Sequence, residues 1–154
     1  MNLLTEREYY KPFNYPWAFE HYKSQQHMHW LPDEVNLADD LKDFREKLSP
    51  GNKKLLTQIF RFFTQADVDV CCGYAKHYLP TFKQPEVRMM LSAFAAMEAV
   101  HQEAYSLLLE TLGFPEEEYQ EFMKHKAMMD KHEYLSDFGM GTKMDIAKTM
   151  AIYS

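Results

Sequence analysis

The chain of 154 residues is long enough for one domain with a sizeable core, and its formal net charge is −6. That negative balance argues against nucleic acid or an anionic membrane surface as a partner, and no apolar run approaches the ~20 residues that span a bilayer. The composition, with only 5 Gly, 11 Met and 15% aromatic residues, indicates an all-α protein with a bulky core.

The cysteines indicate a reducing environment. Cys71 and Cys72 are adjacent and are the only 2 cysteines, so they form a poor disulfide pair and no zinc framework. The N-terminus also lacks the basic-then-apolar pattern of a secretory signal. We therefore expect a cytoplasmic protein.

Short elements are expected in the first third of the chain. Residues 1–14 look irregular and carry several aromatic side chains. A helix is expected from Pro16 to about His27, because proline suits the first turn of a helix. Pro32 ends the segment that follows, and one or two short helices are expected from Asp33 to Leu48.

Longer helices are expected after the break at residues 49–52, which reads Ser-Pro-Gly-Asn. Proline and glycine predict further helix breaks at 80–85, 113–115 and 139–141. Between these breaks the expected helices cover residues 53–79, 86–112, 116–138 and, finally, 144–154.

The expected helix over 86–112 carries polar groups on its apolar face. At ~100° per residue, the following side chains fall on one side of the helix. They are Leu91, Phe94, Glu98, His101, Tyr105, Leu108 and Leu112. A carboxylate and an imidazole in a low-dielectric interior are costly unless they are paired or bind a metal. Glu-x-x-His on an inward helix face is the motif that four-helix di-iron carboxylate proteins take from each of two helices.

Glu-x-x-His also occurs by chance as a solvated surface pair, so a second carboxylate is needed. Asp67 supplies one, because it falls on the inward face of the expected helix 53–79, close to Phe63, Val70 and Tyr74. Asp69 lies roughly 160° away around the same helix. The alternative for Asp67 is a carboxylate bonded to a backbone or tyrosine donor.

Oxygen and imidazole ligands suit iron or manganese better than zinc, which prefers Cys and His in a tetrahedral site. Asp67, Glu98 and His101 would bind one metal, and Glu98 is free to bridge to a second. Tyr105, one turn beyond His101, is placed to lose an electron and a proton to an oxidised metal pair. Because a phenol has a pKa near ~10, Tyr105 is neutral at rest, and its oxidation requires proton loss.

These residues together resemble a known family. Asp67 stands 31 positions before Glu98, which opens Glu98-Ala99-Val100-His101, and Tyr105 follows. An upstream segment, Trp30-Leu31-Pro32-Asp33-Glu34-Val35, looks like the family's Trp-x-Pro-x-Glu-Val segment. Over essentially its whole length the chain resembles the radical-generating small subunit of class I ribonucleotide reductase.

The resemblance implies a ferritin-like helical bundle with a dinuclear iron site, for which manganese-containing variants are an alternative. Such a site reacts with dioxygen and oxidises Tyr105 to a stable radical. The radical would pass, through Trp30 among others, to the large catalytic subunit, which reduces ribonucleoside diphosphates. For Trp30 the alternative is plain aromatic packing beside Pro32. The family also implies a homodimer, and Tyr74, Phe63 and Phe94 are expected to form the dry shell around the radical.

The chain departs from the family in one respect. A family chain is about twice as long, and its later helices bring another Glu and a second Glu-x-x-His for the second metal. None of the other glutamates in this sequence has a His three positions later. We therefore expect one helical domain over 1–154, the N-terminal half of the fold, truncated before the second ligand-bearing helix pair. A C-terminal half would bind in trans or follow in a longer protein, because a bundle without it exposes apolar faces.

Two other functions remain open on the sequence alone. One is a different ferritin-like di-iron oxidase that keeps the ligands and uses Tyr105 in another way. The other is a non-catalytic helical fragment that serves as an interaction module, in which Glu98 and His101 are remnants.

Overall fold

The computed structural model describes residues 2–153, and the described part of the chain contains helices and no strand, as the composition predicted. Two compact units are present. The first contains the described residues of 1–29, 70–98 and 137–154, and the second contains 30–69 and 99–136. None of the helices described is long and apolar enough to cross a membrane.

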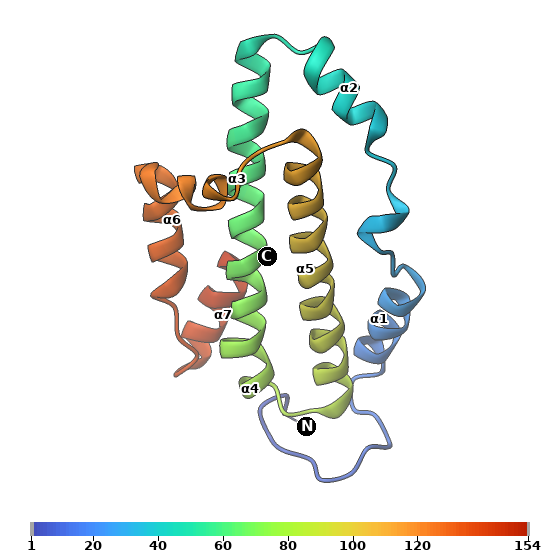
Figure 1. Cartoon of the computed structure of the whole chain (residues 1–154). Coiled ribbons are helices and arrows are strands. Elements are labelled where there is room, and N and C mark those ends of the chain that lie inside the picture. Colours follow the sequence, from blue (N-terminus) through green and yellow to red (C-terminus); the bar gives the residue numbers. More distant parts are fainter. Residues whose placement is uncertain (1, 154) are drawn as a thin grey trace. The chain divides into compact units, whose positions relative to one another are not determined.

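Two long helices, α3 (Pro50–Gly73) and α5 (Pro85–Leu112), contribute residues to both units (Figure 1). In the first unit they approach each other where the Cys71 thiol contacts the carbonyl oxygen of Ala95 at 3.7 Å. In the second unit they approach where Phe63 stacks on Tyr105. The residues predicted from the sequence to be metal ligands lie on these two helices.

The first unit is completed by short helices around a small core. They are α1 (Pro16–His27), the π-helix η2 (Tyr74–Tyr78), α4 (Leu79–Thr81) and α7 (Lys143–Ile152). The core cluster consists of Ala18, Tyr78, Phe82, Val87, Met90 and Leu91. Thr142 caps α7 in a capping box with Asp145, which satisfies backbone groups at the start of that helix.

The N-terminal segment is held to the start of α5 by one buried carboxylate. Glu86 is 0% exposed, and it accepts hydrogen bonds from the backbone N–H groups of Asn14 at 2.8 Å and Tyr15 at 2.9 Å. Arg7 donates to its other oxygen at 2.6 Å. Burial raises the pKa of Glu86, but the hydrogen bonds and the Arg7 charge outweigh it and lower the pKa below its usual value. The described residues of the irregular segment expected at 1–14 therefore pack on their own chain.

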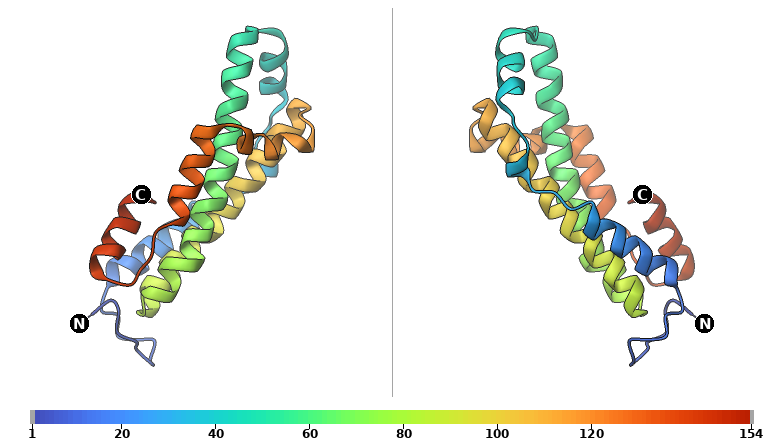
Figure 2. Two further views of the ribbon diagram at one scale, coloured as in Figure 1. Left: turned by 90° about the vertical axis from the view of Figure 1, so that its left-hand side faces the viewer. Right: turned by 90° about the vertical axis from the view of Figure 1, so that its right-hand side faces the viewer.

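The second unit adds the 3-10 helix η1 (Pro32–Glu34), α2 (Ala38–Glu46), the 3-10 helix η3 (Glu116–Lys124) and α6 (Lys126–Ser136). Figure 2 shows α2 folding back beside the first turns of α3, where the Lys53 ammonium donates to the carbonyl oxygen of Arg45 at 2.9 Å. Arg61 on α3 forms an ion pair with Glu118 on η3. This pair holds η3 against α3.

Two expected boundaries are wrong. The helix expected at 53–79 begins at Pro50 and continues through η2 and α4 to Thr81, so Pro80 lies inside it. The wide π turn before Pro80 gives its ring room, which removes the clash that normally ends a helix at proline. The single helix expected at 116–138 is divided at His125, whose φ of −102° and ψ of 105° are extended.

Candidate metal centre

The second unit fixes the register of α3 against α5 beside the predicted ligands. Gln102 on α5 donates from its side-chain amide to the backbone carbonyl oxygen of Asp67 on α3, at 3.2 Å. One turn away on each helix, the rings of Phe63 and Tyr105 lie parallel, 5.9 Å apart between centroids and 4° between planes. These two contacts place Asp67 opposite the stretch of α5 that contains His101.

Three side chains named from the sequence come together. Asp67, Glu98 and His101 each offer one ligand atom, a carboxylate oxygen or a ring nitrogen, and these atoms lie within 4.8 Å of one another. Glu98 precedes His101 by one turn of the continuous helix α5, as the Glu-x-x-His spacing requires. All three residues are partly buried. Two carboxylates and an imidazole at this spacing are a donor set that fits a hard or borderline divalent cation.

Tyr105 lies beside this group. Burial, and then the nearby charge of Asp67, raise the pKa of Tyr105 above its ordinary value of 10.0. The phenol is therefore protonated at neutral pH. The stacked ring of Phe63 fixes the orientation of the phenol ring.

Trp30 is also close to the predicted ligands. Its ring lies 6.3 Å from the His101 ring between centroids, with 33° between the planes. In the second unit, an apolar hollow of about 170 Å³ is lined by Trp30, Tyr105 and Leu108, among others. The side chains of the second unit thus bring an indole, an imidazole and a phenol together.

The dry shell expected around Tyr105 is only partly formed by the described residues. Phe63, one of its expected members, is 42% exposed. The other two, Tyr74 and Phe94, contact each other in the first unit at 6.4 Å between ring centroids. Part of the Phe63 ring is therefore exposed beside Tyr105.

Asp69 faces away from the ligand candidates, as the helical projection indicated. Both of its carboxylate oxygens lie 2.9 Å from Nδ1 of His132 on α6. The side-chain amide of Gln65 also donates to it at 2.9 Å. His132 and its contact with Asp69 were not predicted, because no spacing rule connects residues 63 positions apart. The Glu86 network was missed for the same reason.

In the described residues, a helical fold gathers two carboxylates and an imidazole from adjacent helices, an arrangement similar to that of helical carboxylate metalloproteins. The comparisons with known proteins narrow this class. The family model described as "Ribonucleotide reductase, small chain" matches residues 7–154. The chain therefore belongs to the ribonucleotide reductase small-chain family.

Individual relatives also support membership of the small-chain family. The chain is 50% identical over 138 residues to a probable ribonucleoside-diphosphate reductase small subunit of Invertebrate iridescent virus 6, covering 90% of this chain and 38% of the relative. It is 32% identical over 124 residues to the small chain of Trypanosoma brucei brucei, covering 79% and 36%. The chain thus spans less than two fifths of the length of these curated relatives.

Solved structures give the fold. The R2 subunit of ribonucleotide reductase from Clostridium botulinum matches with a TM-score of 0.80 at 18% identity, over 90% of this chain and 46% of that one. The dimanganese(II)-NrdF of Streptococcus sanguinis matches with a TM-score of 0.75 at 22% identity, over 89% and 51%. These matches confirm the predicted ferritin-like all-α fold, of which the chain represents about half.

Proposed function

We propose that this chain supplies one half of the dinuclear metal centre of a class I ribonucleoside-diphosphate reductase small subunit. The observation that carries the proposal is the group formed by Asp67, Glu98 and His101, whose ligand atoms lie within 4.8 Å of one another in a chain of this family. In this proposal Asp67, Glu98 and His101 would hold the first metal, and Glu98 would be shared with the second.

The metal is iron or manganese. Carboxylate and imidazole donors accept either ion, and no cysteine is among them to favour zinc. A structural relative is described as a dimanganese(II) protein, which supports manganese as an alternative to iron. When bound, the metal pair supplies dioxygen activation and one-electron oxidising power.

Residues of this chain would then take part in the transfer of the electron and the proton. Tyr105 is the proposed radical site: its phenol lies beside Asp67, stays protonated at rest, and must release its proton when it loses an electron. The ring of Phe63 stacks on the phenol ring and fixes its orientation. Trp30, in ring contact with His101, is proposed as one step of electron transfer toward the large catalytic subunit.

The second metal needs ligands beyond these three. We propose that chain 1–154 acts as one helical domain and that a C-terminal half, in trans or in a longer protein, brings the remaining carboxylates and histidine. That half would cover the hollow beside Trp30 and Tyr105. The complete small subunit would work as a homodimer in the cytoplasm, where the large subunit makes deoxyribonucleotides.

The test uses the complete small subunit that contains this chain, loaded with ferrous iron and exposed to dioxygen. We expect a narrow electron-paramagnetic-resonance signal near g = 2 that is lost in Tyr105→Phe. Glu98→Ala and His101→Ala should abolish dinuclear metal loading and leave the helical circular-dichroism spectrum unchanged. Full loading in both variants would remove these residues from the ligand set and favour a helical interaction module.

A further inference from the structure

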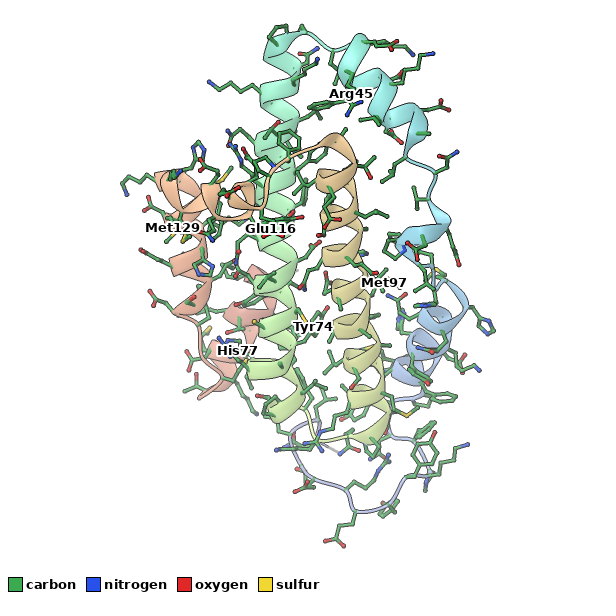
Figure 3. The ribbon with its side chains drawn as sticks, in the orientation of Figure 1. Arg45, Tyr74, His77, Met97, Glu116 and Met129 are labelled. Carbon is green, nitrogen blue, oxygen red and sulfur yellow. The ribbon has the colours of Figure 1, made fainter. Side chains whose placement is uncertain are left out.

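A second phenol, that of Tyr74, lies in the first unit together with Glu98. Tyr74 is the first residue of the π-helix η2, and its side chain points toward α5 (Figure 3). Its ring contacts that of Phe94, which lies one turn before Glu98 on α5. Short π segments inserted in α-helices are frequent at functional sites, because the extra residue re-aims the side chains around it.

The surroundings of Tyr74 parallel those of Tyr105. Burial, and then the charge of Glu98, raise the pKa of Tyr74 above 10.0. For Tyr105 the two causes are burial and the charge of Asp67. Each phenol is partly buried and neutral at rest, and each ring packs against a phenylalanine ring, that of Phe94 for Tyr74 and that of Phe63 for Tyr105.

We propose that Tyr74 is a second electron donor to the metal centre, used when Tyr105 is absent or already oxidised; this inference rests on the proposed function. In the step, Tyr74 gives one electron to the oxidised metal pair, which is reduced by one electron. The phenol O–H bond breaks, and the proton passes to water, which the partly exposed side chain reaches. The product is a neutral phenoxyl radical at Tyr74.

The neighbouring Tyr78 is a matched control. Its ring lies 5.4 Å from that of Tyr74 between centroids, and it offers the same phenol. However, Tyr78 is only 8% exposed, and its hydroxyl donates to the backbone carbonyl oxygen of Thr149 at 3.3 Å. A carbonyl does not accept a proton at neutral pH, and burial raises the pKa of Tyr78 to about 12. Tyr78 is therefore a poor site for oxidation with proton loss.

The experiment compares the complete small subunit with three variants, each loaded with ferrous iron, exposed to dioxygen and frozen within seconds. The variants are Tyr105→Phe, Tyr105→Phe with Tyr74→Phe, and Tyr105→Phe with Tyr78→Phe. Electron paramagnetic resonance with ring-deuterated tyrosine identifies tyrosyl radicals, and metal content with circular dichroism checks folding. Tyr74→Leu is a second variant in case the phenylalanine change lowers metal loading.

We expect Tyr105→Phe to show a new tyrosyl signal with a different hyperfine pattern, because ring orientation differs at the second site. Adding Tyr74→Phe or Tyr74→Leu should abolish that signal, and adding Tyr78→Phe should leave it. If the wild-type signal forms but Tyr105→Phe gives no tyrosyl radical, or one that survives loss of Tyr74, the inference is overturned and the proposed function stands. If metal-loaded wild type forms no tyrosyl radical, both fail.

Discussion

Carboxylates have different partners at two places in the molecule. One place is the network around Glu86, and the other is the group formed by Asp67, Glu98 and His101. Glu86 is fully buried and is neutralised by Arg7 and two backbone N–H donors of its own chain. The other site brings two carboxylates and an imidazole within 4.8 Å of one another. Two like charges at that spacing repel unless a cation joins them. The comparison separates a carboxylate whose partners lie in its own chain from carboxylates that we propose bind a metal.

The largest expected effect is on folding. Glu86→Ala leaves the buried Arg7 guanidinium without its anionic partner and the backbone N–H groups of Asn14 and Tyr15 without an acceptor. Breaking a buried ion pair on one side costs about 3–5 kcal/mol. The free energy of unfolding, measured in urea, should fall by that amount, and the exposed Glu103→Ala on the same helix should stay within about 0.5 kcal/mol of wild type. Equal effects in the two variants would contradict a stabilising role for Glu86.

The same network predicts a pH dependence. The folded pKa of Glu86 lies below its usual value of 4.5, so the folded state binds fewer protons at this group than the unfolded state. Its contribution to stability is complete above pH 4.5 and is lost as the pH falls through the folded pKa. Acid unfolding of wild type should therefore be steeper below that pH than in Glu86→Gln. Parallel pH profiles in the two proteins would show that the carboxyl is not held ionised by the fold.

A smaller change in the free energy of unfolding is expected for a substitution of Asp67 in the metal-free protein. Asp67→Asn removes one of two like charges and keeps the side-chain shape. We expect the free energy of unfolding of the metal-free protein to change by no more than about 1 kcal/mol, because relief of repulsion offsets the loss of local contacts. A loss as large as that in Glu86→Ala would make Asp67 structural, and the contrast between the two sites would disappear.

Local helical periodicity was enough to predict the ligand candidates. The 3.6-residue repeat placed Glu98 and His101 on one face and separated Asp67 from Asp69, and the structure brings the first three together while Asp69 contacts His132. These features depend only on which side of a helix a residue occupies. The all-α class was likewise predicted from the composition and from the helical periodicity of the apolar residues.

The features that were missed depend on contacts between distant segments. Nothing near Arg7 indicates that it will reach Glu86, 79 residues later. The passage of a helix through Pro80 also needed the π turn over Tyr74–Tyr78, which periodicity does not reveal. Tertiary packing determines both features, and the spacing of residues in the sequence does not predict it.

The most direct test compares two aspartates of one helix that lie on opposite faces. Asp67→Asn and Asp69→Asn make the same chemical change two residues apart in the complete small subunit, and metal content per subunit is then measured after loading with iron or manganese. We predict that Asp67→Asn loses dinuclear loading and that Asp69→Asn keeps it, because Asp69 is turned toward His132. Full loading of Asp67→Asn, or equal loss in both variants, would contradict the assignment of the metal site.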